Sequence, residues 1–394
     1  MEPSADPFLF VAVHKGPYLS IQPLEQVLGP QGVLYLVEGV SREERCQKEL
    51  PFLDLARVQR EWGSLEEFLE RAQVRAVIRS SSEDVLEQNA EELATAAAAN
   101  VNIPVFVVED FPGNYWPKAP ERLDGLFVED DSLVELHQSR GADPRVIYHT
   151  GNPRYNALMT LDARGLRTET RKALGLAQGQ VMLWAGQPDG DNSYQTLARL
   201  LEEFDRRQVT LLFRAHPRDV AYAQGKYHAL LAKTSMNVVD VSSHPDALGL
   251  YCASDLVVTQ FSSAGVEASH LGTPALFALF DDLGKKYLRC FKGCDMLPWC
   301  TGGCSFVVER EDEVARVMEQ ALFDDAAREQ VRASFRRRFG ARGNSAKAIA
   351  DRIRAVVGKG TQQEPDPCPG DAAATRLHPE DGRGSVIRRR VARG

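Results

Sequence analysis

The chain has 394 residues, of which 43% are hydrophobic and 26% charged, a globular composition with enough length for two domains that each bury a core. The net charge of −8 argues against broad nucleic-acid binding. No apolar run is long enough to span a membrane, and the acidic N-terminus lacks the basic part of a secretory signal, so we expect a cytoplasmic protein.

Short apolar runs alternate with helical patterns through the first part of the chain. The runs are bounded by turn residues and have the length that a parallel sheet buries on both faces. Such alternation predicts parallel strands joined by right-handed crossovers. The predicted strands cover residues 8–13, 32–37, 74–78, 105–108, 125–128 and 145–148, and the predicted helices cover 21–28 and a stretch that ends at Ala99.

The same alternation restarts after the segment from His149 to Tyr155, which we take as the connection between two domains. We predict a first domain of residues 1–150, a second of 151–358, and a disordered tail of 359–394 that is rich in Gly, Pro, Gln, Asp and Arg. The second set of predicted strands covers 180–184, 210–213, 237–240, 256–259, 274–280 and 306–308, and the predicted helices cover 167–174, 196–204, 247–252, 266–271, 311–339 and 346–357.

The turn after the predicted strand 256–259 has the residues of a phosphate site. Free N–H groups at a helix N-terminus bind phosphate, and Ser262 and Ser263 add hydroxyl donors. Gly265 permits close approach of the backbone, and Glu267 could accept a hydrogen bond from a ribose hydroxyl. The alternative is an ordinary strand–helix turn whose serines cap the helix. The motif alone leaves both interpretations open.

Three segments resemble known families. Ser262 to Ala268, with Leu271-Gly272-Thr273-Pro274 after it, resembles the nucleotide-binding segment of GT-B glycosyltransferases, especially UDP-N-acetylglucosamine 2-epimerases and CDP-glycerol glycerophosphotransferases. His149 to Tyr155 resembles the T-G-N-P segment that joins their domains, and Arg214-Ala215-His216-Pro217 resembles the histidine–proline element of the glycerophosphotransferases. The resemblance implies an α/β protein with two Rossmann-like GT-B domains, a cleft between them and a C-terminal helix that crosses back onto the first domain.

Candidate donor-binding residues also follow other strands of the second half. Gly186 suits the close approach of a phosphate or sugar. Arg214 and His216 come directly after the predicted strand 210–213, and His216 could donate a hydrogen bond to a diphosphate oxygen as the leaving group departs. The alternative for His216 is a strand-end histidine satisfied by a backbone carbonyl.

Candidate acceptor-side residues follow strands of the first half. His14 and Asp110 are candidates for the base that deprotonates the acceptor, and Glu109 is an alternative to Asp110. In the loop 112–116, Tyr115 and Trp116 could stack on a sugar or another ring. The alternative is that these are surface carboxylates and core aromatics.

These residues predict a GT-B transferase that moves a sugar from a nucleotide-activated donor, expected to be a UDP-sugar, to a small-molecule or glycan acceptor. The expected catalytic residues are His14, Asp110 and His216, and the expected donor-binding residues are Gly186, Arg214, His216, Ser262, Ser263, Gly265 and Glu267. We expect no cofactor and no metal, because basic side chains and a helix dipole can neutralise the leaving group. We also expect no nucleic-acid partner, with a second copy of the chain as a candidate partner in a homodimer.

Three alternatives to this function stay open at the level of sequence. One is an isomerase or hydrolase of the UDP-N-acetylglucosamine 2-epimerase type. Another is a CDP-glycerol-type phosphotransferase, and the third is a non-catalytic protein that binds nucleotide sugars on the same fold. An assay without acceptor separates the first from a transferase, because an epimerase needs only the nucleotide sugar.

Four cysteines lie close together in the sequence. Cys290, Cys294, Cys300 and Cys304 follow the pattern C-x3-C-x5-C-x3-C, which differs from the usual C-x2-C pairs of zinc sites. We expect free, partly buried thiols here, and a metal site or a disulfide is the alternative.

Overall fold

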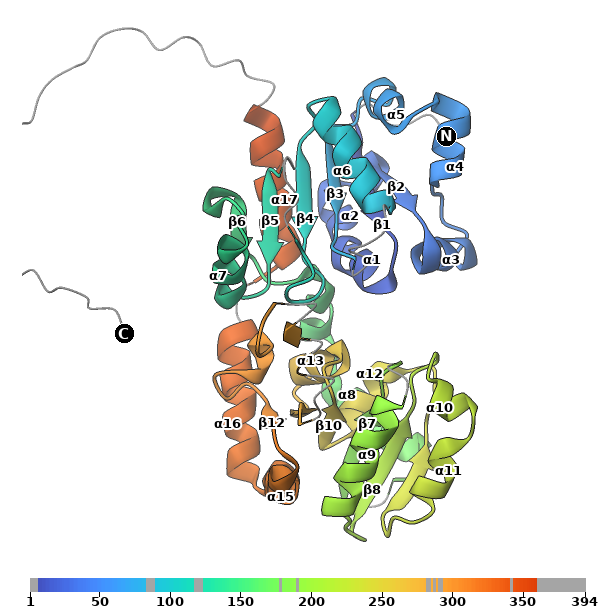
Figure 1. Ribbon diagram of the computed structural model, residues 1–394, viewed down its shortest axis with the longest axis vertical. Helices are drawn as coiled ribbons and strands as arrows, with labels where there is room; N and C mark the ends of the chain where they lie inside the picture. Colours follow the sequence, from blue (N-terminus) through green and yellow to red (C-terminus); the bar gives the residue numbers. More distant parts are fainter. Residues whose placement is uncertain are drawn as a thin grey trace, which may run out of the picture.

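The computed structural model describes residues 6–82, 89–116, 123–176, 179–188, 191–280, 285, 288–289, 293–340 and 343–359. It has two α/β halves that follow one another along the long axis of the molecule (Figure 1). Each half contains a six-stranded sheet, and all of the neighbouring strands that pair are parallel. The predicted α/β class with two Rossmann-like domains is therefore confirmed.

The first sheet has the strand order β2-β1-β3-β4-β5-β6. Every residue of β1, β3, β4 and β5 is buried, as expected for strands covered by helices on both faces. The strands are β1 (Phe8–Ala12), β2 (Val33–Val37), β3 (Ala76–Arg79), β4 (Val105–Val108), β5 (Gly125–Val128) and β6 (Ile147–His149), and the helices are α1 (Lys15–Ile21), α2 (Pro23–Leu28), α3 (Gly39–Gln47), α4 (Leu55–Trp62), α5 (Leu65–Arg71), α6 (Ala90–Asn100) and α7 (Asp131–Ser139).

The second sheet has the strand order β12-β11-β10-β7-β8-β9. Its strands are β7 (Gln180–Ala185), β8 (Val209–Arg214), β9 (Asn237–Asp240), β10 (Leu256–Thr259), β11 (Ala275–Ala278) and β12 (Phe306–Val308), and its helices are α8 (Ala163–Ala173), α9 (Asn192–Glu203), α10 (Val220–Ala223), α11 (Lys226–Leu231), α12 (Ala247–Ala253), α13 (Ser263–His270), α15 (Val314–Phe323) and α16 (Asp325–Phe335). Among the described residues, no helix has both the length and the apolar character needed to cross a membrane.

The last helix, α17 (Ser345–Lys359), returns to the first half of the molecule. Its Ala346, Ile349 and Ile353 repeat at helical spacing and are buried in the same hydrophobic cluster as Phe10 and Ile21. Figure 1 shows α17 behind the first sheet. The predicted crossover helix is confirmed, and α17 packs with the first half although the division at residue 358 assigned it to the second. The predicted tail 359–394 lies outside the described residues apart from Lys359, the last residue of α17.

Several predicted helices have different bounds in the structure. The stretch 21–28 is divided between α1 and α2, and α8 and α9 each begin four residues before the predicted start. The stretch 311–339 is interrupted at Asp324, whose backbone is extended. The Asp324 side chain accepts the Ala327 N–H at 3.0 Å, and α16 begins there as a separate helix. Helix α13 begins at Ser263, three residues before the predicted start. Ser263 and Gly265 therefore lie within the first turn of the helix and are not part of a loop.

Candidate functional site

The two halves meet at a junction formed by strand ends of the first sheet, the connecting segment, and two helical segments of the second half. We call this region the junction and define it by Asp110, Glu129, Asp130, Arg154, Tyr155, Ser263, Glu267, His270 and Arg338, which interact across it.

The connecting segment is fixed to the first half by Asn152. Its Nδ2 donates to the backbone carbonyls of Glu109 at 3.3 Å and Asp110 at 3.4 Å, at the end of β4. Arg154 follows in the short 3-10 helix Pro153–Tyr155 and extends into the second half. The segment therefore ties the end of β4 to helix α13.

Arg154 binds two of the predicted donor-site residues at once. Its Nη2 donates to Ser263 Oγ at 3.2 Å and to the carboxylate of Glu267. The side chains of Arg154 and Glu267 are 17% and 15% exposed. Burial lowers the pKa of Arg154, but the neighbouring Glu267 and Tyr155 outweigh it, so the pKa is raised and the guanidinium keeps its charge. Arg154 was not predicted from the sequence.

Asp110, the predicted base, is held close to this ion pair. Its Oδ1 accepts hydrogen bonds from Ser81 Oγ at 3.1 Å and from Asn114 Nδ2 at 3.0 Å. A Cβ on Gly16 would lie 2.7 Å from Asp110 Oδ2, so only glycine fits there without movement. An electrostatic interaction links Asp110 with Arg154. The structure thus brings the predicted acceptor-side carboxylate and the predicted donor turn together around one arginine.

His14, the other predicted base, comes from the loop after β1. It is half-buried, precedes α1, and its backbone carbonyl accepts from Ser41 Oγ at 2.9 Å. Strand β3 lies between β1 and β4, and Gly16, in the first turn of α1, packs against Asp110. His14 therefore lies at the same carboxyl edge of the first sheet as Asp110, and strand β3 separates the two strands that these residues follow.

Arg214, the last residue of β8, and His216, which follows the strand, lie on the second-half side. Nδ1 of His216 accepts the Arg218 N–H at 3.1 Å, an arrangement that assigns the proton to Nε2. Burial and the nearby Arg218 lower the pKa of His216, so its imidazole is a neutral donor at neutral pH. The pKa of Tyr251 is raised by burial and by Glu267, whereas Arg214 and Arg154 oppose the rise. Arg214 therefore shares the electrostatic environment of Glu267.

The three remaining predicted donor residues have structural contacts. Ser262 Oγ accepts the Ala264 N–H at 3.2 Å and caps α13. At Gly265 an added Cβ would lie 2.6 Å from Phe277 Cζ, so this glycine allows the helix to pack on the sheet. The close approach that we expected of a ligand is here an approach of the neighbouring strand. Gly186 donates to the Arg214 carbonyl at 2.9 Å and is half-buried.

Glu109 and Tyr115 have internal partners. Glu109 Oε1 lies 2.9 Å from His137 Nε2 and accepts the Tyr115 N–H at 3.2 Å, with both side chains of the Glu109–His137 pair buried. Tyr115 is 2% exposed and its ring contacts His137 edge-on, so the expectation that it stacks on an acceptor is wrong. Trp116 is covered on one side by the Arg140 guanidinium, 3.8 Å from its ring centroid.

Residues 129–355 match the profile of the CDP-Glycerol:Poly(glycerophosphate) glycerophosphotransferase family. The chain belongs to this family. The match includes Arg154, Arg214, His216, Ser263 and Glu267, and the acceptor-side residues His14 and Asp110 precede it. A search of curated proteins found no match.

Solved structures share the fold at low sequence identity. The UDP-GlcNAc 2-epimerase from Neisseria meningitidis bound to UDP-GlcNAc is 16% identical, with a TM-score of 0.62 over 89% of this chain and 100% of that chain. The UDP-GlcNAc 2-epimerase from Methanocaldococcus jannaschii is 12% identical, with a TM-score of 0.58 over 89% and 99%. The wall teichoic acid polymerase TagF, soaked with CDPG, is 18% identical, with a TM-score of 0.54 over 92% and 91%. The predicted resemblance to both families is confirmed.

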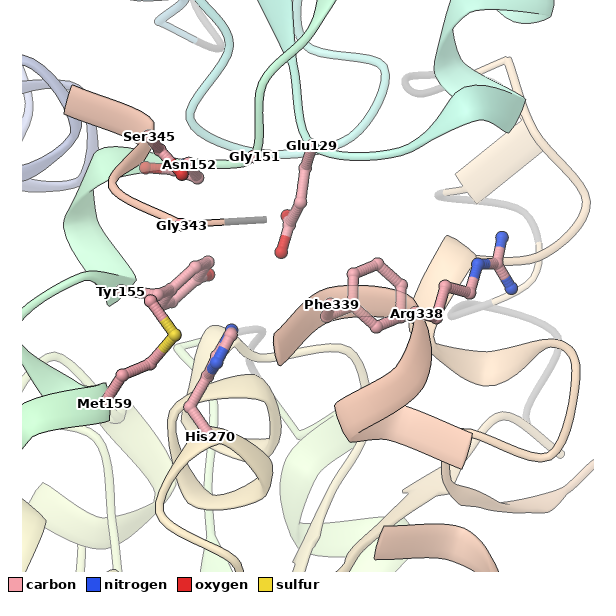
Figure 2. A pocket seen from close by; sticks show the side chains of 10 residues that line it. All are labelled: Glu129, Gly151, Asn152, Tyr155, Met159, His270, Arg338, Phe339, Gly343 and Ser345. Carbon is pink, nitrogen blue, oxygen red and sulfur yellow. The ribbon is translucent and has the colours of Figure 1, made fainter. Parts of the chain in front are cut away.

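A buried carboxyl group at the junction was also missed by the sequence reasoning. Figure 2 shows the carboxyl group of Glu129 pointing into a cavity that Tyr155 and His270 also line. The cavity has a volume of about 20 Å³, enough for one water molecule. Burial, assisted by Asp130 and Glu109 and opposed by Arg154, raises the pKa of Glu129 to about 8. Burial lowers the pKa of His270 to about 4, so both groups are neutral at pH 7.

Three of the four clustered cysteines fall within the described residues, and Cys290 lies outside them. Cys294, Cys300 and Cys304 are free thiols in the structure. Burial raises the pKa values of Cys300 and Cys304, which disfavours the thiolate that binds metal. Within the described part of the chain, no group of three or more His, Cys, Asp or Glu side chains is arranged to hold a metal ion.

Proposed function

We propose that this protein transfers a phosphoglycerol-type group from a CDP-linked donor to an acceptor hydroxyl at the junction. The observation that carries the proposal is that Arg154 bridges Ser263 and Glu267 and also interacts with Asp110. A cation between a helix N-terminus and a carboxylate base is what a phosphoryl transfer needs. Membership of the glycerophosphotransferase family supports the choice of donor.

The donor diphosphate would bind at the N-terminus of α13. Ser263 Oγ is a donor for a phosphate oxygen, and the helix dipole favours negative charge there. Arg154 would supply a guanidinium, and the Nε2–H of His216 a neutral hydrogen bond. With these groups, we expect the leaving-group charge to be neutralised by the protein itself.

The acceptor hydroxyl would be activated by Asp110. As the acceptor oxygen attacks the distal phosphorus, its proton passes to the Asp110 carboxylate. The new phosphorus–oxygen bond forms while the bond from that phosphorus to the bridging oxygen breaks, and CMP departs with the electron pair. The hydrogen bonds from Ser81 and Asn114 to Oδ1 fix the orientation of the carboxylate.

The UDP-sugar donor expected from the sequence remains a separate prediction, in which the bond from the sugar to the diphosphate breaks and UDP departs. Incubation with CDP-glycerol or with UDP-N-acetylglucosamine, each with and without a polyol acceptor, distinguishes the two. We expect CMP to be released from CDP-glycerol only when acceptor is present. UDP release that depends on acceptor would replace the proposal by sugar transfer, and an epimer formed without acceptor would replace it by isomerisation.

A binding screen tests the donor site without assuming an acceptor. Cytidine and uridine diphosphates should raise the melting temperature of the protein, because a ligand that binds only the folded state stabilises it by mass action. The Ser263→Ala variant should show a smaller shift with the same nucleotides. If no nucleoside diphosphate changes the melting temperature of the wild-type protein, the proposed donor site is wrong.

A further inference from the structure

The ion pair between Arg154 and Glu267 occupies the position at which a phosphate would bind. Ser263 and Glu267 are four residues apart on α13 and so lie on the same face of the helix. Arg154 reaches both with the same nitrogen, Nη2, so a phosphate oxygen approaching Ser263 meets the guanidinium already paired with a carboxylate.

A second arginine, Arg214, lies in the same region as Glu267. The charges of Glu267, Arg214 and Arg154 all act on the Tyr251 phenol, so these three side chains lie in the same region of the junction. Arg214 Nη1 is buried and has no hydrogen-bond partner among the described residues. Arg154 pairs with Glu267, and the guanidinium of Arg214 lies in the same region of the junction.

Such an arrangement favours an exchange of anions. A phosphate group has more acceptor oxygens and more charge than a carboxylate, and it matches the two-pronged geometry of arginine equally well. The Arg154 and Glu267 side chains are 17% and 15% exposed, so the pair is mostly buried and keeps a small exposed edge.

We propose that Glu267 is an internal counter-ion of Arg154 in the ligand-free protein, and that the distal phosphate of the donor displaces it and binds Arg154 and Ser263. This inference rests on the proposed function and adds a binding residue, Arg154, together with a residue that competes with the ligand. It follows that the affinity for a diphosphate is set by a competition inside the site. A nucleoside monophosphate, which lacks the distal phosphate, does not displace Glu267.

The test is calorimetric titration of the full-length protein with inorganic pyrophosphate, CMP and CDP. Replacement of Glu267 by glutamine removes the competing charge, so E267Q should bind pyrophosphate about tenfold more tightly than the wild type. R154Q should bind pyrophosphate and CDP at least about tenfold more weakly, while its affinity for CMP changes by less than about threefold. The double variant should behave like R154Q alone, because Glu267 then has no guanidinium to mask.

Two controls separate this proposal from simpler explanations. The exposed Arg199–Glu311 pair lies on the surface of the second half, so E311Q removes the same charge without touching the junction and should leave pyrophosphate binding unchanged. Thermal melting of each variant verifies folding, and R154K tests whether a single charge can replace the guanidinium.

The outcomes distinguish the inference from the proposed function. If the wild type binds CDP and releases CMP but E267Q binds pyrophosphate no more tightly, the competition is wrong and the function stands. An R154Q variant with wild-type affinity for pyrophosphate likewise overturns the role of Arg154. If the wild type binds neither CDP nor pyrophosphate, both the inference and the proposed function are wrong.

Discussion

Arg338 and Asp130 form a two-point ion pair that holds the two halves of the molecule together. Nε of Arg338 donates to Oδ2 of Asp130 and Nη2 donates to Oδ1, both at 2.7 Å, and the Asp130 side chain is 4% exposed. Burial raises the pKa of Asp130, but the hydrogen bonds from Arg338 and Ser132 outweigh it and hold the pKa at about 2. The pair therefore stabilises the arrangement of the halves wherever Asp130 is ionised.

Substitution of Arg338 by methionine should weaken this contact. Asp130 would remain buried without its cation, so we expect a loss of about 2–4 kcal/mol in the free energy of unfolding. Denaturant titration measures the loss, and small-angle scattering should show a larger radius of gyration if the halves separate. In the background of Asp130→Asn, where no buried charge would be left unpaired, the same substitution should lower the free energy of unfolding clearly less. Equal costs in both backgrounds would show that the ion pair does not join the halves.

The raised pKa of Glu129 predicts that the stability of the protein depends on pH. Its pKa is about 8 in the folded protein, against an ordinary value of 4.5, so the unfolded chain loses this proton first as the pH rises. The folded state then binds more protons than the unfolded state, and stability falls between about pH 4.5 and pH 8. At pH 8, Glu129→Gln should be more stable than the wild type by roughly 1–3 kcal/mol. The difference between the two proteins should vanish near pH 4, and a difference independent of pH would contradict the raised pKa.

The buried pair of Glu109 and His137 should matter for stability. His137→Phe leaves the Glu109 carboxylate buried and without its imidazole partner, so we expect a loss of about 3 kcal/mol in unfolding free energy. Glu135 lies on the exposed side of the same helix, α7, and Glu135→Ala should change stability by less than about 0.5 kcal/mol. Chemical denaturation of the three proteins in parallel checks this. A His137 variant as stable as the Glu135 control would mean that the pair is not needed.

Substitution of Gly265 tests whether this glycine in the first turn of α13 is needed for packing or for ligand binding. An added Cβ would meet Phe277, so Gly265→Ala should destabilise the protein by about 1–3 kcal/mol, and Phe277→Leu should recover part of that loss by making room. If Gly265→Ala instead leaves the melting temperature unchanged and weakens CDP binding, the glycine is required by the ligand. Thermal melting with and without CDP separates the two results.

The strands were predictable because their apolar runs end at turn residues. The predicted bounds of β4, β5, β9, β10 and β12 agree with the structure to the residue. Burial on both faces of a parallel sheet produces continuous apolar runs, and these are read directly from the sequence. The crossover of α17 was predictable from the family resemblance together with its apolar stripe.

Several helices were not predicted although their start signals are present. Asp54, Ser64 and Asp130 each accept a backbone N–H at the start of α4, α5 and α7, respectively. Helices α4 and α5 are short and have few buried residues, so each presents only a brief apolar pattern in the sequence. A search for capping residues followed by helix formers would have found them.

Site residues could be predicted where they lie within one segment of the sequence. They could not be predicted where segments far apart in the sequence meet. Ser263 and Glu267 were identified from a single strand–turn–helix segment. Arg154 and Ser263 are 109 residues apart, and Asp130 and Arg338 are 208 residues apart, so only the folded chain reveals these contacts. Arg154 does lie within the segment that resembles the domain connection, and a basic residue there was the one available signal.

The most direct measurement of the central claim is the rate of CMP release from CDP-glycerol in the presence of a polyol acceptor, compared between the wild type and Asp110→Asn. Asparagine keeps the size of the side chain and its contacts with Ser81 and Asn114 but cannot take up the acceptor proton. We predict acceptor-dependent release by the wild type and a rate lower by about 100-fold or more in the variant, with CDP affinity unchanged. Release at the same rate by both proteins, or no acceptor-dependent release by the wild type, would contradict group transfer at this junction.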